Sequence, residues 1–202
     1  MSTGNKTLDE LALQYHTDKS SEVHGFADFY DKHLHSIRDK KVKILEIGIG
    51  KQKAPSLHMW ADYFTNGIIY GYDILSPENF EINNKRIRVH KVDQSDTGQL
   101  KEALEKHGPF DLIIDDGSHV ISHQKRSLRY GIPALKDGGI FIMEDLHTSL
   151  NEHYKGKNID ELPSTLEVVN NLTCEKHIYK QNTVGDALNR TSITSVIYPH
   201  RS

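Results

Sequence analysis

The sequence has little of three things that would mark its surroundings: cysteine, long apolar runs and excess positive charge. Cys174 is the only cysteine among 202 residues, so a disulfide within the chain is excluded and a reducing compartment is expected. The polar segment Met1–Glu10 lacks a secretory core, and no apolar run approaches the roughly 20 residues of a transmembrane helix. The formal net charge is -3 and the lysines are dispersed, unlike a nucleic-acid footprint. These absences predict a cytoplasmic protein that binds neither nucleic acid nor membrane.

Short apolar segments alternate with amphipathic ones along the chain, at the spacing of β-α-β units. This alternation predicts an α/β fold: a doubly wound, mostly parallel seven-stranded sheet with a C-terminal antiparallel hairpin and helices on both faces. The predicted strands are Lys43–Ile49, Ile68–Ile74, Ile87–Asp93, Phe110–Asp115, Ile140–Glu144, Cys174–Gln181 and Ser192–Tyr198. The predicted helices are Leu8–Tyr15, Gly25–Ile37, Ala54–Phe64, Asp96–His107, Ser122–Leu135 and Ser164–Asn171.

The length and the absence of repeats or linkers favour a single domain over residues 1–202. Within it we expect a helical cover in residues 1–40 and a binding core in residues 41–149. Residues 150–202 are expected to form a loop or lid and the terminal hairpin.

A glycine turn follows the first predicted strand, at Glu46-Ile47-Gly48-Ile49-Gly50. Glycines between a strand and a helix let a ligand approach the backbone closely. The third glycine of the dinucleotide fingerprint is missing, because Lys53 occupies its place. On this motif alone, a ligand-binding turn and a purely structural turn are equally favoured.

Polar residues end the next two predicted strands. Asp73 lies at the end of the second strand, where a carboxylate can accept hydrogen bonds from ribose hydroxyls. Asp93 ends the third strand and is followed by Gln94, where adenine edges are commonly bound. An acidic edge with few phosphate-binding features suits a positively charged ligand, and S-adenosyl-L-methionine, which carries a sulfonium and an ammonium group, fits that description.

The strongest signal is a pair of acidic clusters behind two further strands. Asp115-Asp116-Gly117-Ser118-His119 follows one strand, and Glu144-Asp145 follows the next. If these strands are parallel neighbours, the carboxylates and His119 meet at one edge of the sheet, an arrangement that is costly without a cation. Each cluster alone has a simpler interpretation: Asp115-Asp116 could end a strand and cap the next helix, and Glu144-Asp145 could be a solvated strand end. The presence of both clusters favours the functional interpretation.

These motifs together resemble a known family. The order LEIGIG, IYGYDI, VDQSD, FDLIIDDGSH and LKDGGIFIMEDLHTS resembles the class I S-adenosylmethionine-dependent methyltransferases. It is similar in particular to the metal-dependent sugar O-methyltransferases of the macrolide and rhamnosyl type, related to the cephalosporin-hydroxylase-like group. The segment Tyr15–Lys19, followed by His24-Gly25-Phe26 and Tyr30, resembles the N-terminal signature of that group. The likeness runs from about Leu11 to Ser149.

The resemblance implies two cofactors, S-adenosyl-L-methionine and Mg²⁺. Asp116, Glu144 and Asp145 would hold the cation, and His119 would be the general base. The residues implied at the cofactor pocket are Glu46, Gly48, Asp73, Asp93 and Asp115, with Thr17, Asp18 and Lys19 closing over it. His147 and Thr148 would lie near the acceptor. Lys19 is equally consistent with a surface charge.

Methyl transfer to a sugar explains why a cation and a histidine would occur together. A sugar hydroxyl is a far weaker acid than a protonated imidazole, so a histidine alone deprotonates it poorly. Mg²⁺ on the hydroxyl oxygen lowers its pKa, and hard carboxylate oxygens suit this ion. His119 follows Asp116 by three residues, so a helix beginning here would place both on one face.

The sequence predicts an O-methyltransferase that acts on a sugar hydroxyl of a glycan, nucleotide sugar or glycosylated natural product. A nicotinamide-dependent oxidoreductase, a metal-dependent hydrolase and a non-catalytic binding subunit are the alternatives. The missing third glycine argues against the oxidoreductase, and the intact carboxylate clusters argue against a non-catalytic protein. The acceptor and a homo-oligomeric state stay open.

Overall fold

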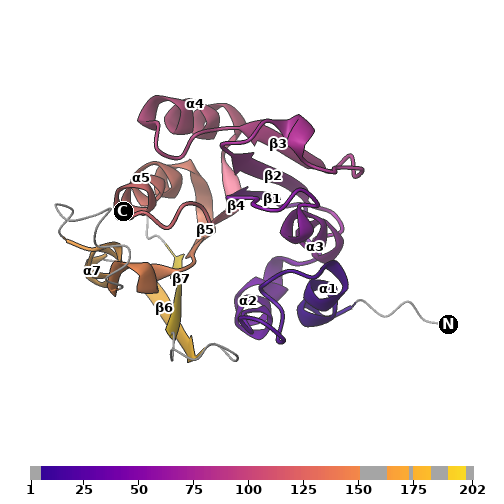
Figure 1. Cartoon of the computed structure of the whole chain (residues 1–202), viewed down its shortest axis with the longest axis horizontal. Helices are drawn as coiled ribbons and strands as arrows, with labels where there is room; N and C mark the ends of the chain where they lie inside the picture. Colours follow the sequence, from indigo (N-terminus) through magenta and orange to yellow (C-terminus); the bar gives the residue numbers. More distant parts are fainter. Residues whose placement is uncertain (1–5, 151–162, 173–174, 183–190, 199–202) are drawn as a thin grey trace.

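A computed structural model describes residues 6–150, 163–172, 175–182 and 191–198. Its centre is one sheet with the strand order β3-β2-β1-β4-β5-β7-β6 (Figure 1). Strands β1 to β5 pair in parallel, whereas β7 pairs antiparallel with β5 and β6 pairs antiparallel with β7. The strands are β1 (Lys43–Ile47), β2 (Ile68–Asp73), β3 (Ile87–Lys91), β4 (Phe110–Asp115), β5 (Leu135–Met143), β6 (Glu175–Asn182) and β7 (Thr191–Tyr198).

The predicted Rossmann-like, mostly parallel sheet is confirmed. Parallel pairing extends over five strands and not seven, since β7 and β6 run antiparallel. The connection between β6 and β7, residues 183–190, lies outside the described residues, so the terminal hairpin stays a prediction. The expected lid at residues 151–162 lies outside them as well.

Helices cover both faces of the sheet and bury two separate apolar clusters (Figure 1). Helices α1, α2 and α3 cover one face, packing on β-strand residues such as Ile44 and Leu112. Helices α4, α5 and α7 cover the other, packing on residues such as Leu45 and Ile113. The helices are α1 (Leu8–Tyr15), α2 (Ala27–Leu34), α3 (Pro55–Tyr63), α4 (Thr97–His107), α5 (Ile121–Gly131) and α7 (Thr165–Asn171). Single 3₁₀ turns are η1 (His35–Ile37), η2 (Pro77–Asn79), η3 (Ile132–Ala134) and η4 (Leu146–Leu150).

No helix in the described part of the chain has the length and apolar character needed to cross a bilayer.

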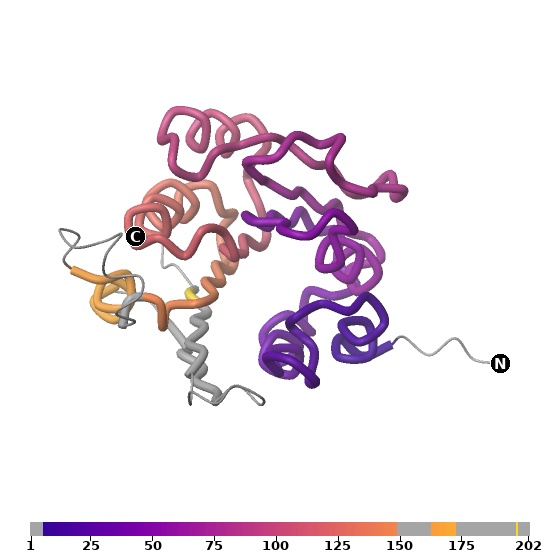
Figure 2. The backbone as a smooth tube through the Cα atoms, viewed as in Figure 1, coloured from indigo at the N-terminus to yellow at the C-terminus, as the bar shows by residue number. Residues whose placement is uncertain are grey.

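The N-terminal helices lie beside α3 (Figure 2). Lys19, in the segment between α1 and α2, contacts Asp116 directly after β4. Helix α1 begins with a capping box, in which the Thr7 side chain accepts from the Glu10 amide and the Glu10 side chain accepts from the Thr7 amide. The left-handed residue His16 ends it. The chain therefore turns sharply after α1, which brings residues 17–20 over the strand ends.

The boundary between α5 and β5 differs from the prediction. The expected helix to Leu135 stops at Gly131, and β5 already begins at Leu135. Pro133 cannot donate the hydrogen bond that would continue the helix, so one 3₁₀ turn follows instead. Leu135 is a buried strand residue that pairs with Phe110. Sequence periodicity cannot distinguish such an apolar residue from one at the end of a helix.

Candidate active site at the carboxyl ends of the parallel strands

The ends of β1, β4 and β5 lie side by side at one edge of the sheet. The register pairs Ile47 of β1 with Asp115 of β4, and Asp115 with Met143 of β5. The residues that follow, Gly48, Asp116 and Glu144, are therefore neighbours. The strand order reverses between β1 and β4, and this switch point is where open α/β sheets bind ligands. The predicted meeting of the two acidic clusters is confirmed.

Gly48 cannot carry a side chain in this arrangement. Its φ is +92°, and a Cβ built on it would lie 2.1 Å from the Asp116 carbonyl oxygen. This contact explains why β1 ends at Ile47 and not at Ile49 as predicted: the chain turns at Gly48 to pass the β4 strand end. The glycine turn thus has a structural role in addition to any contact with a ligand.

Asp116, His119 and Asp145 form a group that could hold a metal ion. Each offers one ligand atom, and these atoms lie within 4.8 Å of one another. His119 Nε2 lies 3.3 Å from Asp145 Oδ2, and the side chains are partly exposed, 26% and 22%. Two carboxylates and an imidazole at this spacing fit a divalent cation, and the oxygen donors suit Mg²⁺.

Two members of this group have strained backbone conformations that neighbouring contacts hold in place. His119 has a φ of +58° and Asp145 a φ of +54°, values that L-residues other than glycine rarely adopt. The single proton of the Thr148 hydroxyl is shared between the Asp145 carbonyl oxygen at 2.8 Å and the His119 carbonyl oxygen at 3.1 Å. The expectation that a helix places Asp116 and His119 on one face is wrong, because α5 begins only at Ile121. A strained turn presents His119 instead.

Lys19 is buried in the middle of the carboxylates. Its Nζ lies 2.6 Å from Asp116 Oδ2 and 3.1 Å from Glu144 Oε1, and its side chain is 1% exposed. Glu46 Oε1 and Asp18 Oδ1 lie at 3.7 and 3.8 Å. The alternative that Lys19 is a surface charge is therefore wrong: its ammonium is the counter-charge of the acidic cluster.

The electrostatics of this cluster follow from burial and from this one cation. Burial raises the pKa of Asp116, and the Lys19 ammonium opposes the rise. Burial and then the neighbouring Asp116 charge hold the pKa of Glu144 well above its usual range. Burial alone would lower the pKa of Lys19, but the charges of Asp116 and Glu144 raise it well above its usual value. The cluster therefore still favours the binding of further positive charge.

Two adjoining cavities lie beside the strand ends and share Gly48, Gly50, Asp116 and Gly117 in their walls. The larger one, about 330 Å³, is lined by four of the predicted cofactor residues: Gly48, Asp73, Asp93 and Gln94. The smaller one, about 240 Å³, is lined by Thr17, Asp18, Lys19, Gly48 and also His119. Seven of the predicted cofactor residues, together with Asp116 and His119 of the metal-binding group, thus line two adjoining cavities.

Asp73 and Asp93 also organise the loops around the larger cavity. Asp73 Oδ2 accepts from the Ile49 and Gly50 amides at 2.9 and 3.2 Å, which fixes the glycine turn. Asp93 lies two residues beyond the end of β3 and accepts from the Ser95 amide at 2.7 Å. Each carboxylate keeps lone pairs that a ligand hydroxyl could use.

Glu46 and Asp115 lie beneath these cavities and line neither of them. Glu46 is fully buried on β1 and accepts from the Ser56 hydroxyl at 2.7 Å. Asp115 accepts from Gln94 Nε2, at 2.9 and 3.0 Å to its two oxygens. Asp115 was expected to line the cofactor cavity, but it does not. Its carboxylate instead holds the side chain of Gln94, which does line the cavity.

Two residues contribute to this region without a role predicted from the sequence. The Tyr30 hydroxyl, from α2, donates to Glu144 Oε1. Ile74 follows Asp73, lines the larger cavity and is 61% exposed. In the sequence, an apolar residue directly after an acidic strand end could have indicated that Ile74 forms part of the wall of a ligand cavity. For Tyr30, only the resemblance of the N-terminal segment pointed to the position.

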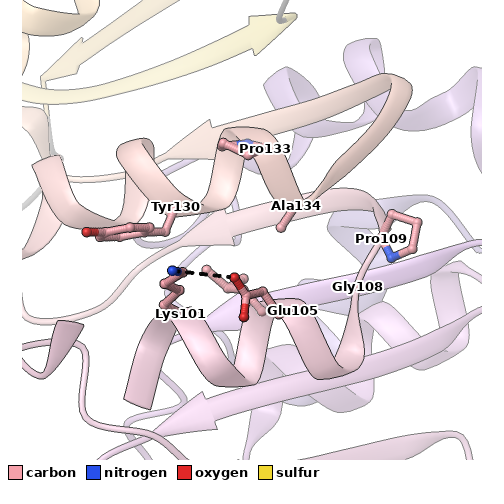
Figure 3. A pocket seen from close by; sticks show the side chains of 8 residues that line it. Lys101, Glu105, Gly108, Pro109, Tyr130, Pro133 and Ala134 are labelled. Carbon is pink, nitrogen blue, oxygen red and sulfur yellow. Dashed lines mark ion pairs between the residues drawn. The ribbon is translucent and has the colours of Figure 1, made fainter. Parts of the chain in front are cut away.

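The remaining predicted residues lie around the metal-binding group. His147 Nδ1 lies 3.5 Å from Asp145 Oδ1, and Thr148 bonds to the backbone of His119 and Asp145. A separate cavity of about 430 Å³ lies between Leu104 on α4 and Tyr130 on α5, near Pro109 at the amino end of β4 (Figure 3). It is at the opposite end of β4 from Asp116 and contains none of the predicted site residues.

Comparison with known proteins agrees with this geometry, although no family model matches the chain. The chain is 39% identical over 195 residues to L-olivosyl-oleandolide 3-O-methyltransferase of Streptomyces antibioticus, covering 92% of this chain and 50% of that protein. It is 38% identical over 154 residues to 8-demethyl-8-(2-methoxy-alpha-L-rhamnosyl)-tetracenomycin-C 3'-O-methyltransferase of Streptomyces olivaceus, covering 74% of this chain and 39% of that one.

A solved structure of the MycE methyltransferase from the mycinamycin biosynthetic pathway, in complex with Mg and SAH, has a TM-score of 0.81 and 28% identity to the chain. The match covers 98% of this chain and 55% of MycE. The chain thus spans about half the length, or less, of the relatives it matches. By sequence, the chain is a homologue of sugar O-methyltransferases of macrolide and tetracenomycin pathways, and its fold is that of a class I methyltransferase.

Proposed function

We propose that the chain is an S-adenosyl-L-methionine- and Mg²⁺-dependent O-methyltransferase that acts on a sugar hydroxyl of a glycosylated small molecule. One observation carries the proposal. A cavity at the switch point of the sheet, lined by Gly48 and Asp73, adjoins a second cavity lined by His119, beside a carboxylate pair. The names of the relatives, which include an olivosyl 3-O-methyltransferase and a rhamnosyl 3'-O-methyltransferase, support the same reaction.

The methyl donor would lie along the two adjoining cavities. Asp73 would accept hydrogen bonds from the ribose hydroxyls, and Asp93 and Gln94 would lie beside the adenine. Thr17, Asp18 and Lys19 would close over the other end, beside Gly48. Glu46 and Asp115 would act from below, because both are buried and hold cavity-lining side chains or helix residues in place.

The metal would be held by Asp116, Glu144 and Asp145, the three carboxylates of the two acidic clusters. Asp116 and Asp145 belong to the group whose ligand atoms lie within 4.8 Å of one another. Glu144 lies beside Asp116, since both contact the same Lys19 ammonium. When bound there, Mg²⁺ would lower the pKa of an acceptor hydroxyl and fix its position.

His119 would act as the general base. Its imidazole would take the hydroxyl proton while the oxygen forms its bond to the methyl carbon. The carbon–sulfur bond breaks in the same step, and its electron pair stays on sulfur, which leaves as a neutral thioether. Asp145, 3.3 Å from Nε2, would stabilise the imidazolium that results. His147 and Thr148, which contact Asp145 and the turn backbone, would lie near the acceptor.

The domain and tail organisation belongs to the same proposal. Residues 41–149 would supply the cofactor and metal sites, and residues 1–40 would cover them. Residues 150–202 would form the lid and the terminal hairpin of β6 and β7. The acceptor would enter from the side of His119.

Isothermal titration calorimetry with S-adenosyl-L-methionine, S-adenosylhomocysteine and NADH tests the proposal. We expect saturable binding of the first two and none of NADH. Binding of NADH alone would favour the oxidoreductase alternative. Cofactor binding without methyl transfer to a panel of olivosyl and rhamnosyl glycosides, with Mg²⁺ present, would contradict the acceptor class.

A further inference from the structure

Lys19 occupies the place where a cation is needed, and it holds one of the carboxylates assigned to the metal. Glu144 Oε1 contacts the Lys19 ammonium at 3.1 Å and accepts a hydrogen bond from Tyr30. Asp116 Oδ2 contacts the same ammonium at 2.6 Å. A divalent cation between Asp116 and Glu144 would lie beside the Lys19 ammonium and would compete with it for the negative charge of the same two carboxylates.

The surroundings show that Lys19 balances charge and does not merely fill space. Glu144 and Lys19 are almost fully buried, and Glu46 Oε1 lies 3.7 Å from the ammonium. Buried carboxylates without a cation are strongly unfavourable, so the ammonium is what allows them to lie together. A positive charge between the carboxylates reduces their mutual repulsion, and either an ammonium group or a metal ion can supply that charge.

We propose that Lys19 is an internal cation that competes with the divalent metal for Asp116 and Glu144, so that metal binding releases its ammonium from them. This inference rests on the proposed metal site and adds a positioning residue to it. The released ammonium has a place to go, because Lys19 already lines the cavity of about 240 Å³ beside Thr17 and Gly48. Its backbone can stay fixed, since the Lys19 carbonyl accepts from the Ala27 amide at the start of α2.

Two consequences separate competition from a fixed structural ion pair. A neutral side chain at position 19 removes the competitor, so the metal should bind more tightly. The ammonium, 1% exposed in the pair, should become reactive when the metal displaces it. A fixed ion pair predicts an unchanged or weaker metal affinity and a lysine that stays protected.

Calorimetric titration of the cofactor-free protein with Mg²⁺ and with Mn²⁺ measures the first consequence. We expect Lys19→Met to tighten binding by about tenfold or more, because a unit positive charge close to the ion is removed. Lys19→Arg, which keeps the charge, should bind as weakly as the unaltered chain. Lys101→Met is the matched control: this lysine is 56% exposed on α4 and should leave the affinity unchanged.

Lysine acetylation of the unaltered protein measures the second consequence without any substitution. Mass spectrometry after brief treatment with an N-hydroxysuccinimide ester should find Lys19 protected without Mg²⁺ and acetylated at saturating Mg²⁺, with Lys101 acetylated in both. Trp60, the sole tryptophan, packs 5.2 Å from Tyr30 and should report the change at Glu144 by fluorescence.

The outcomes distinguish this inference from the proposed function. If no Mg²⁺ or Mn²⁺ binds to the unaltered chain, the proposed metal site fails. If the metal binds but Lys19→Met does not bind it more tightly, or Lys19 stays protected at saturation, only the competition is overturned.

Discussion

His119 Nε2 lies 3.3 Å from Asp145 Oδ2, and both residues hold their backbone in the left-handed region, at φ +58° and +54°. Two strained residues that face each other are retained only where the surrounding structure fixes them. Here the Thr148 hydroxyl bonds to both backbones. The pairing orients the His119 ring and places a negative charge beside it, which would stabilise the imidazolium that a general base forms.

Replacing His119 with alanine should abolish methyl transfer and spare cofactor binding. Loss of a general base typically lowers the rate by about 10²- to 10⁴-fold, so kcat should fall by at least about 100-fold. Calorimetry should show S-adenosyl-L-methionine and Mg²⁺ affinities within a few-fold of the unaltered chain. His35→Ala, at an imidazole 71% exposed on η1, is the control. A large loss of Mg²⁺ affinity would make His119 a metal ligand and not the base.

Asp145→Asn should weaken Mg²⁺ binding and activity together. The substitution keeps the size of the side chain but removes a charge and one strong donor, so we expect Mg²⁺ affinity to fall by about 10-fold or more. Chelation should likewise remove activity from the unaltered enzyme, and added Mg²⁺ should restore it. Asp28→Asn, at an exposed carboxylate on α2, should change neither quantity. Activity that survives exhaustive chelation would contradict a metal-assisted reaction.

Gly48→Ala should destabilise the fold and block the cofactor cavity. The new Cβ would lie 2.1 Å from the Asp116 carbonyl oxygen, in addition to the strain of φ +92°. We expect the free energy of unfolding, measured by urea denaturation, to fall by about 3 kcal/mol or more. Gly138→Ala separates the two causes, because φ is +71° there and nothing lies within 4 Å of the added Cβ. It should cost only about 1 kcal/mol; equal losses would mean that the contact with Asp116 is unimportant.

Glu46 should make the protein less stable as the pH rises from about 4.5 to 7. Burial raises the pKa of Glu46 from 4.5 to about 7. Between these values the folded state binds the proton and the unfolded state has released it, so the free energy of unfolding falls as the pH rises. The full contribution, about 3 kcal/mol, is present below pH 4.5 and lost above pH 7.

Urea denaturation across pH 4 to 8 should show this slope in the unaltered chain and a flatter profile for Glu46→Gln. The exposed Glu102 on α4 provides the control, and Glu102→Gln should keep the slope of the unaltered chain. Identical profiles for all three proteins would show that Glu46 titrates normally in the folded state.

The sequence by itself determined the layered fold and most of the candidate site. Alternating strands and helices predict a parallel sheet, and parallel strands bring their carboxyl ends to one edge. Asp73, Asp116 and Glu144 were therefore expected along that edge. These inferences need only residue types and short spacings. Two predicted boundaries were wrong. The first strand was extended past Gly48, because a close backbone approach leaves no mark in the periodicity of the sequence. Leu135 was assigned to a helix, because an apolar residue at the start of a strand resembles one at the end of a helix.

Only the tertiary structure decided which groups neutralise and orient the acidic cluster. Lys19 contacts Asp116 across 97 residues of sequence, and Tyr30 contacts Glu144 across 114. Neither pair leaves a pattern in the chain, because a lysine and a tyrosine near short helices look the same whether they are exposed or buried. Side-chain periodicity specifies which face of an element is apolar, whereas the partner of a buried charge depends on how distant elements pack, and that packing placed the ammonium of Lys19 among the carboxylates.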